Sequence, residues 1–486
     1  MSQLLFPPTE ELNASLGKNS AFTSAGHARW RKALDELWNL NRCHAGSDTS
    51  RAYRILADHY PGTEVFGYAS GERSGSWIAP PGWEVRHARL TGPDGVMIAD
   101  YDKCKLHLFT YSPPFQGIVT REELLPHLLS NPDRPLIVPF HFRNQYRHWA
   151  PEWGFCIPHD VFERLPPGEY GVDIDTSFTD DRMEMAEQTH AGESADTLLL
   201  IGHFDHPAQC NDGLVGCLAG HEVIRRLSGR KTRLTYRMLS TIEIVGSVFY
   251  AERRARQQQV REGLFVGMSG AQTPFLFQQS SRARASIDRA IAHVLSHSVK
   301  DAQIAEFRAE IGNDETAFDC HGIDIPCASL LRARLVQYHC SDDTPENVDD
   351  ACVEEMIDVI LKAIDVLEQN ASLSGTFSGL PCLASPELDL YLNRLYMSGF
   401  QVSSNDATRR LIESLPGESH RRDASRAGQR MNRLMTLLPT MVDGTFSTLD
   451  IAERAGVPFS VAHAYTDLWV EKKLLRKTWI NPFAEK

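Results

Sequence analysis

The sequence predicts an α/β protein, with a mostly parallel β-sheet flanked by helices, an inserted β-rich subdomain and a C-terminal winged helix-turn-helix domain. Three observations support this fold class. Buried strand candidates alternate with helical stretches between residues 197 and 368, and short β-prone runs fill residues 62–175. Near the C-terminus, two short helical stretches flank a Gly-Val-Pro turn. Alternating strands and helices imply crossover connections and a parallel sheet covered on both faces.

Length and composition set the expected number of domains. The chain has 486 residues, which is too long for one hydrophobic core. With 42% hydrophobic and 23% charged residues, it has the composition of an ordinary globular protein. We expect a helical N-terminal part of the main domain at residues 1–61, the inserted β-rich subdomain at 62–175, the main α/β domain at 176–370 and the winged helix at 385–486.

Charge and hydropathy exclude several classes of protein. The net charge of -13 disfavours a nucleic-acid-coating protein, because phosphate binding needs clustered Lys and Arg. The N-terminal segment MSQLLFPPTEELNAS lacks a signal-peptide pattern, and no apolar stretch reaches the length of a membrane span. The ten cysteines form no CxxC pair, so we interpret them as reduced thiols. We therefore expect a cytoplasmic protein without a membrane partner.

The first 175 residues divide into a helical and a β-prone part. Residues 28–59 are broadly helical, because Trp30, Leu34 and Leu37 recur at helical spacing before Pro61 ends the pattern. The runs GSWIAPPGWEV, GVMIADYDKCKLHLFTYSPP and LIVPFHF then predict short strands separated by turns.

The main α/β domain shows four strand and helix pairs. Functional side chains are expected at the carboxyl ends of its parallel strands. The predicted strands are 197–204, 234–241, 264–269 and 326–332, and the predicted helices are 213–227, 246–258, 287–298 and 346–368.

The C-terminal part begins after a small, polar and Gly-rich segment, NASLSGTFSGLP, which predicts a linker. The stretch FSTLDIAERAGVPFSVAHAYTDLWVEKKLLRK predicts two helices and a strand pair starting near Leu474, the pattern of a winged helix-turn-helix. Its second helix has almost no Arg, Lys, Asn or Gln to read base edges. We therefore expect it to pack against protein in a homo-oligomer rather than to bind nucleic acid.

The densest polar cluster follows the strand at 197–204. It contains His203, Asp205 and His206, followed by Asn211 and Asp212. Zinc prefers neutral imidazole and carboxylate ligands, and a catalytic zinc site commonly has three protein ligands. Solvated His and Asp also occur in ordinary loops at strand ends. This run alone therefore favours a metal site but is also compatible with an ordinary loop.

Two further segments strengthen the metal hypothesis. Glu243 follows the next strand in STIEIVGS, and His339 stands in the segment YHCSDDT before the long last helix. The order HxD, Asp-Gly, Glu-x-x-Gly and Tyr-His-x-x-x-Asp resembles the zinc exopeptidases of the di-zinc aminopeptidase family. The sequence is more similar to a bacterial aminopeptidase-like subfamily with an inserted β subdomain and a C-terminal winged helix. Its landmarks are HWAPEWGFCIP, HFDHPAQCNDGLVG, GNDETAF, YHCSDDT and DIAERAGVPF.

The resemblance implies a zinc exopeptidase-like fold and a role for each matching residue. It assigns His203, Asp212 and His339 to metal binding, Glu243 to general acid and base catalysis, and Asp205 to the support of His203. Two departures from the di-zinc pattern stand out: Ile244 follows Glu243 where a second glutamate is expected, and VGMSGAQTP contains no acidic residue. Because a second cation would lack carboxylate ligands, we expect one zinc per chain.

Other polar residues leave alternatives open. Glu243 could instead cap the following helix. His206 could be a third imidazole ligand or a loop hydrogen-bond donor. Arg332 could bind a substrate carboxylate or form an internal ion pair. Tyr338 is a further substrate-binding candidate, and Asp314 and Glu315 could bind a substrate amine or cap a short helix.

Two functions follow as hypotheses. The first is a mononuclear zinc-dependent amidohydrolase that cleaves the amide of an amino acid or short peptide derivative within a specialised biosynthetic pathway. The second is a catalytically inert binding or regulatory protein that uses its winged helix for DNA or protein partners. The missing di-zinc carboxylates favour the second, and the retention of His203, Asp212, His339 and Glu243 together favours the first.

Overall fold

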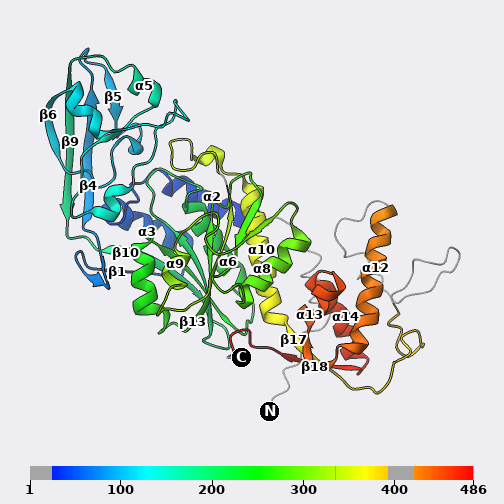
Figure 1. Ribbon diagram of the computed structural model, residues 1–486. Coiled ribbons are helices and arrows are strands. Elements are labelled where there is room, and N and C mark those ends of the chain that lie inside the picture. The colour runs from blue at the N-terminus through cyan, green and yellow to red at the C-terminus, as the bar shows by residue number, and fades with distance from the viewer. Residues whose placement is uncertain (1–23, 334, 392–420, 485–486) are drawn as a thin grey trace.

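An eight-stranded β-sheet forms the centre of the computed structural model in Figure 1, which describes residues 24–333, 335–391 and 421–484. The strand order is β1-β10-β12-β11-β13-β16-β14-β15. Apolar side chains of these strands and of the flanking helices form one continuous core. The strands span Thr63–Tyr68 (β1), Met183–His190 (β10), Thr197–His203 (β11), Thr235–Thr241 (β12), Val260–Gly267 (β13), Phe275–Gln278 (β14), Gln303–Ala305 (β15) and Cys327–Arg332 (β16).

The central sheet is mixed, whereas the sequence led us to expect a mostly parallel one. β12, β11, β13 and β16 are parallel neighbours, as are β14 and β15. β1 and β10 are antiparallel, and so are β10 and β12, and β14 and β16. Residues 191–196 connect β10 to β11, and residues 268–274 connect β13 to β14. The chain reverses there because such short connections cannot contain a crossover helix.

Helices flank the sheet close to the expected positions, with two differences. The stretch expected to be helical over 28–59 forms two helices with a loop between them. The helix expected at 246–258 is shorter and ends in a π-helical turn at Ala251–Ala255. The main helices are Ser24–Leu37 (α2), Ser47–His59 (α3), Leu214–Leu227 (α6), Val245–Tyr250 (α7), Ser286–Ser298 (α8), Glu315–Phe318 (α9) and Asp350–Gln369 (α10).

The inserted β-rich part has a four-stranded antiparallel sheet of order β5-β4-β9-β6 and its own apolar core. Its observed bounds differ from 62–175, because β1 pairs with β10 of the central sheet and β9 continues to Thr179. Composition alone could not assign β1 to one sheet or the other. The strands are Gly82–Thr91 (β4), Met97–Asp100 (β5), Phe115–Thr120 (β6) and Glu169–Thr179 (β9).

Short elements complete the inserted part and its surroundings. They are the strand pairs Arg73–Ser74 (β2) with Trp77–Ile78 (β3) and Leu128–Leu129 (β7) with Phe155–Cys156 (β8), and the helices Arg121–Leu124 (α4), His159–Glu163 (α5), Lys105–His107 (η1), Leu125–His127 (η2), Arg143–Arg147 (η3) and Pro345–Asn347 (η5).

The C-terminal part combines a three-stranded sheet of order β18-β17-β19 with three helices. The predicted linker contains its central strand, because Ala371 and Leu373 are buried in alternation with serines. In place of the strand pair expected near Leu474, one strand, β19, follows the helices and pairs with β17. The elements are Ala371–Gly375 (β17), Arg421–Leu437 (α12), Leu438–Thr440 (η6), Asp443–Ser447 (β18), Thr448–Ala455 (α13), Phe459–Glu471 (α14) and Leu475–Trp479 (β19).

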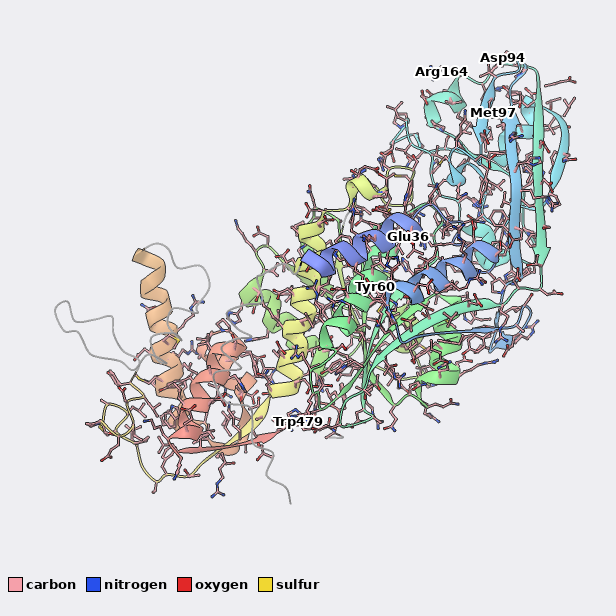
Figure 2. The ribbon with its side chains drawn as sticks, turned by 180° about the vertical axis from the view of Figure 1, so that it is seen from behind. Glu36, Tyr60, Asp94, Met97, Arg164 and Trp479 are labelled. Atoms are coloured by element: carbon pink, nitrogen blue, oxygen red, sulfur yellow. The ribbon has the colours of Figure 1, made fainter. Side chains whose placement is uncertain are left out.

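The two outer parts lie at opposite ends of the central sheet. In Figure 2, Asp94, Met97 and Arg164 mark the far end of the inserted sheet, and Trp479 lies beside the C-terminal helices. Residues 1–23 of the expected N-terminal helical part and residues 392–420 of the expected C-terminal domain lie outside the described residues. Among the described residues, no helix combines the length and apolar character that crossing a membrane requires.

Candidate functional site

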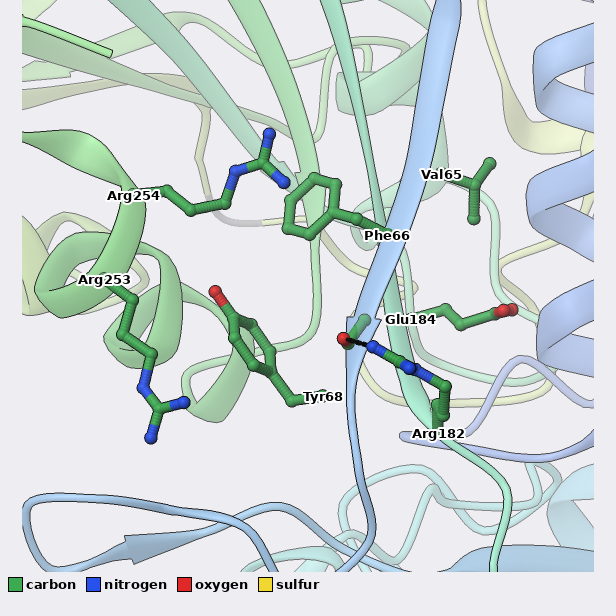
Figure 3. A pocket seen from close by; sticks show the side chains of 8 residues that line it. Val65, Phe66, Tyr68, Arg182, Glu184, Arg253 and Arg254 are labelled. Atoms are coloured by element: carbon green, nitrogen blue, oxygen red, sulfur yellow. Dashed lines mark hydrogen bonds between the residues drawn. The ribbon is translucent and has the colours of Figure 1, made fainter. Parts of the chain in front are cut away.

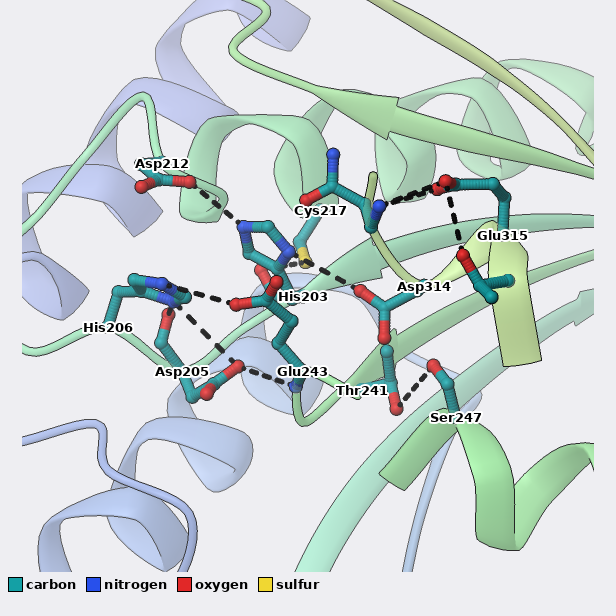
Figure 4. A network of polar contacts seen from close by, with 12 residues as sticks. His203, Asp205, His206, Asp212, Cys217, Thr241, Glu243, Ser247, Asp314 and Glu315 are labelled. Carbon is teal, nitrogen blue, oxygen red and sulfur yellow. Dashed lines mark hydrogen bonds and ion pairs between the residues drawn. The ribbon is translucent and has the colours of Figure 1, made fainter. Parts of the chain in front are cut away.

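The candidate site lies at the carboxyl end of β11, a strand with parallel neighbours on both sides. Every residue of β11 is buried, and the loop that follows it carries the HxDH run. Figure 4 shows side chains from this loop, from the end of β12 and from the start of α9 converging on His203. This is the edge of the sheet at which functional side chains were expected.

His203, Asp212 and His339, far apart in the sequence, meet at this edge. Nε2 of His203 lies 3.1 Å from Oδ1 of Asp212, and Nε2 of His339 lies 3.0 Å from Oδ2 of the same carboxylate. His203 and Asp212 are buried, and the side chain of His339 is 18% exposed. Asp212 therefore presents one oxygen to each of the two imidazoles.

His206, for which the sequence left the roles of a third imidazole ligand and of a loop hydrogen-bond donor open, belongs to the same cluster. One ligand atom from each of His203, His206 and Asp212 lies within 4.8 Å of the others. Nδ1 of His206 is 2.8 Å from the backbone oxygen of Asp205, and its Nε2 is 3.5 Å from Oε2 of Glu243. Burial lowers the pKa of His206 to about 4, so its ring is neutral near pH 7.

The charges of the cluster favour a bound cation. Burial alone would lower the pKa of His203, but hydrogen bonds to Asp212 and Asp314 raise it well above its usual value. Burial opposes ionisation of Asp212, yet His206, His339 and His203 hold the pKa of this carboxyl well below its usual range. The cluster thus stabilises an ionised carboxylate beside positive charge.

The contacts of Asp205 differ from the expected one with His203. Its Oδ1 accepts a hydrogen bond from the backbone N–H of Glu243 at 3.0 Å, and its Oδ2 lies 3.3 Å from Nε2 of His44. The side chain beside Nδ1 of His203 is Asp314, whose Oδ2 is 3.4 Å away. The expected support of His203 by Asp205 is therefore replaced by Asp314, because α9 brings Asp314 to the far side of the ring.

Asp314 and Glu315 have separate surroundings although they are adjacent. Asp314 is fully buried, and its carboxylate lies against the His203 ring. Both oxygens of Glu315 accept from the backbone N–H of Asn313, at 2.9 and 3.0 Å. Glu315 therefore holds its own turn, whereas Asp314 faces the cluster.

Glu243 lies beside the cluster as expected for a proton-transfer group. Burial, opposed by His203 and reinforced by the neighbouring carboxylates, of which Asp314 contributes most, raises the pKa of Glu243 to about 8. The side chain of Glu243 is 18% exposed. A carboxyl group whose pKa lies near neutrality can both accept and donate a proton.

Two predicted substrate-binding residues have different outcomes. Arg332 is 5% exposed and forms the internal ion pair that was its alternative, with Glu355, while it donates to the carbonyl of Thr273 at 2.8 Å. Tyr338 is exposed and stacks on the His339 ring with centroids 3.8 Å apart. Both terminal nitrogens of Arg332 are thus engaged inside the protein, whereas Tyr338 is exposed beside His339.

Sequence reasoning missed several residues that hold the site together. The carboxylate of Asp343 accepts hydrogen bonds from the backbone N–H groups of Cys210, Asn211 and Asp212, at 2.9 to 3.1 Å. Asp343 was visible in the segment YHCSDDT, but no pattern assigned it a partner. His44 comes from the loop before α3, where no signal pointed to the site.

A cavity of about 560 Å³ lies elsewhere, along the edge strand β1. Figure 3 shows Phe66 and Tyr68 of this strand beside Arg182, Arg253 and Arg254. Arg182 donates to the carbonyl of Gly67, and Arg253 pairs with Glu72. None of its lining residues belongs to the cluster around His203.

Comparisons with known proteins agree with this geometry. The family model named "Domain of unknown function (DUF4910)" matches residues 31–370. A protein of Clostridium acetobutylicum named "Putative polysaccharide biosynthesis protein with aminopeptidase-like domain" is 27% identical over 340 residues, which cover 69% of this chain and 77% of that protein.

Solved structures show the same fold. A "putative peptidase" from Clostridium acetobutylicum superposes with a TM-score of 0.78 at 23% identity, over 97% of this chain and 100% of that chain. A zinc aminopeptidase from Bacillus subtilis has a TM-score of 0.52 at 11% identity, over 70% and 93%. A peptidase M28 precursor from Shewanella amazonensis has a TM-score of 0.50 at 10% identity, over 74% and 96%. The chain therefore belongs to the DUF4910 family, and it has the α/β fold, with a mixed sheet flanked by helices, of the zinc aminopeptidases.

Proposed function

We propose that this protein is a zinc-dependent hydrolase of the aminopeptidase type that cleaves an amide bond of an amino acid or short peptide derivative. The proposal depends on one observation: His203 and His339 both contact the carboxylate of Asp212, beside Glu243. Imidazole and carboxylate are the ligands of catalytic zinc sites. The fully buried carboxylate of Asp314, whose Oδ2 lies 3.4 Å from Nδ1 of His203, adds negative charge beside the cluster that a cation would offset.

The ligands in this proposal are His203, Asp212 and His339, with one zinc per chain. His203 and His339 flank the two oxygens of Asp212, whereas His206 has Nδ1 on a backbone carbonyl and Nε2 toward Glu243. A zinc ion held there supplies Lewis acidity toward water and toward the substrate carbonyl.

Glu243 supplies the proton transfer in this proposal. Its carboxylate takes a proton from the attacking water and passes it to the nitrogen that leaves when the amide bond breaks. Asp205 holds the backbone of Glu243 in place, because its carboxylate accepts a hydrogen bond from the backbone N–H of Glu243. His44 in turn lies against the other oxygen of Asp205.

The substrate in this proposal is small and carries an amide. The cluster around His203 is buried, and aromatic side chains surround its mouth, among them Phe142 and Tyr338 next to His339. The name of the Clostridium relative refers to polysaccharide biosynthesis. We therefore include N-acyl amino sugars beside aminoacyl amides and short peptides among the compounds to be tested.

Metal analysis and an amide panel test the proposal together. We expect about one zinc per purified chain, loss of zinc in His203→Ala and His339→Ala, and retention in His206→Ala. Glu243→Gln should keep the metal and lose at least about a hundredfold in kcat on the best amide of the panel. If the purified protein is stable without metal and a chelator does not change its stability, the hydrolase proposal is rejected and the inert binding protein is favoured.

A further inference from the structure

The loop that carries His339 comprises residues 335–343, lies between β16 and η5 and consists mostly of turns. His339 itself adopts a left-handed backbone conformation, with a φ of 51°. This conformation is uncommon for a residue other than glycine, and it persists where neighbouring contacts hold it. The position of this proposed metal ligand therefore depends on what the loop contacts.

A segment of the inserted β-rich part, residues 134–142, is paired with the His339 loop. The backbone N–H of Phe140 donates to the carbonyl of His339, and the N–H of Ser341 donates to the carbonyl of Val138, both at 2.9 Å. The N–H of Val138 also donates to Oγ of Ser341 at 3.1 Å. The two segments form an isolated antiparallel bridge as well. Backbone hydrogen bonds thus join the insertion to the loop at His339 itself.

Arg134 joins the same two segments through its side chain. It donates to the carbonyl of Val336 and, at 3.0 Å, to Sγ of Cys340. It also forms an ion pair with Asp342 at 2.7 Å. The planar guanidinium group has several donors in a fixed arrangement, which a lysine ammonium group lacks. One side chain of the insertion therefore holds the loop both before and after His339.

The segment 134–142 is anchored in the inserted part by apolar packing. Val138 and Phe140 are buried in an apolar cluster formed by side chains of that part. The ring of Phe140 also lies next to two imidazoles of the candidate site, with its centroid 5.2 Å from that of His206 and 5.3 Å from that of His339. The segment is thus fixed to the insertion and contacts the site.

We propose that the segment 134–142 makes the inserted part a component of the metal site, and that Arg134 is a positioning residue that holds His339 in place for zinc. This assignment rests on the proposed function, in which His339 is a zinc ligand. Asp343 holds the end of the loop to the main domain through the N–H groups of the loop that carries Asp212. Without Arg134, the part around His339 would adopt further conformations. The apparent affinity for a ligand falls in proportion to the fraction of molecules in the binding conformation.

The test compares Arg134→Met with a matched arginine of the same inserted part. Arg164→Met removes a guanidinium group that also bonds to a carbonyl and a carboxylate, both of Asp160, at the far end of the inserted sheet (Figure 2). Competition with a fluorescent zinc chelator measures the Kd for zinc. We expect this Kd to rise about tenfold or more in Arg134→Met, and to rise less in Arg134→Lys, which keeps the charge beside Asp342. Arg164→Met should match the wild type.

Measurements other than affinity separate a local effect from damage to the whole fold. In excess chelator, the midpoint of thermal unfolding of Arg134→Met should match the wild type, and hydrogen exchange should be faster in residues 335–342. Saturating zinc should restore its kcat, because all three ligands are retained. Should Arg134→Met unfold earlier in chelator, Arg134→Lys provides the comparison.

The outcomes distinguish this assignment from the proposed function. An unchanged zinc Kd in both Arg134 variants, while His339→Ala loses zinc, would overturn the role of Arg134 alone. A wild type that binds no zinc would instead overturn the proposed function, and this assignment with it.

Discussion

At the scale of single residues, Asp343 determines where Asp212 lies. Its side chain is fully buried, and its two oxygens accept from three successive backbone N–H groups, those of Cys210, Asn211 and Asp212. One carboxylate thus shapes the loop that carries a proposed metal ligand. Removal of the carboxylate would leave the buried N–H groups of Asn211 and Asp212 without an acceptor, whereas that of Cys210 keeps the backbone carbonyl of residue 343 at 3.1 Å. An unsatisfied buried donor costs about 1–3 kcal/mol.

We therefore expect Asp343→Ala to lower the free energy of unfolding by about 2 kcal/mol or more and to weaken zinc binding. Denaturant unfolding in the presence of a chelator measures the first effect without a contribution from the metal. The matched control is the neighbouring Asp342→Ala, which removes a partly exposed ion pair with Arg134 worth at most about 1 kcal/mol. Equal losses in the two variants would show that these donors do not depend on Asp343.

The sequence predicted the residues of the site better than their contacts. His203, Asp212 and His339 were singled out by residue type and order, and they do meet. Asp205 was expected to support His203, but the carboxylate beside this ring is that of Asp314, which immediately precedes α9. Asp205 instead accepts a hydrogen bond from the backbone N–H of Glu243.

At the scale of elements, α6 is joined to the central sheet by a buried histidine. Nδ1 of His221 lies 2.9 Å from Oε1 of Gln188 on β10, and Nε2 lies 2.9 Å from Oγ of Ser240 on β12. The amide oxygen can only accept, so Nδ1 donates and Nε2 accepts from the hydroxyl group. A neutral ring satisfies both contacts, and burial lowers the pKa of His221 to about 3.

This arrangement predicts acid sensitivity. An unfolded histidine has a pKa near about 6.5, so between this value and about 3 the unfolded chain binds one proton more than the folded protein at His221. Stability should therefore fall as pH decreases through this range, by up to about 1.4 kcal/mol per pH unit from this residue.

Urea unfolding of the wild type, of His221→Gln and of the exposed control His321→Gln across pH 7 to 4 measures this contribution. The His221 variant should be less stable at pH 7, and its stability should depend less steeply on pH than that of the wild type. The His321 variant should follow the wild type. Parallel curves for all three proteins would contradict the assignment to His221.

Strand and helix positions were predictable where the pattern was local, as in the fully apolar β11 and the amphipathic α10. Strand direction was not, because it depends on whether a connection is long enough for a crossover helix, as between β13 and β14. β17 was taken for a linker because its serines and glycine resemble one; its pairing with β18 and β19 is a long-range contact that composition does not reveal.

At the scale of the whole molecule, the C-terminal part is attached to the main domain by charge and by packing. Arg289 of α8 pairs with Asp450 and Glu453 of α13, each at 2.6 Å. The indole N–H of Trp479 donates to the carbonyl of Leu367 at 3.2 Å. The winged helix-turn-helix remains a proposal for this part, and its helices α13 and α14 meet at Gly456, which adopts a left-handed conformation.

In a winged helix-turn-helix domain, α14 would be the helix that contacts DNA bases, but most of its residues are buried in the protein. Most side chains of α14 are buried, and its partly exposed or exposed charged positions, Asp467 and Glu471, are acidic. Lys477 is engaged by Asp467 at 2.5 Å, and Lys472 donates to the carbonyl of Glu387 at 2.9 Å. Two of the lysines near α14 are thus engaged within the protein, and the net charge of the chain is -13.

We therefore expect no saturable binding of a fluorescent 30-base-pair duplex at protein concentrations up to about 100 µM in 150 mM salt, because ordinary non-specific binders have a Kd of about 1–100 µM under such conditions. Fluorescence anisotropy measures this directly, and a titration at 20 mM salt serves as the electrostatic control. If binding appears and weakens in Lys473→Glu with Arg476→Glu, the C-terminal part is a nucleic-acid module. If none appears, α14 serves packing, because its buried face already forms part of the apolar core of the C-terminal part.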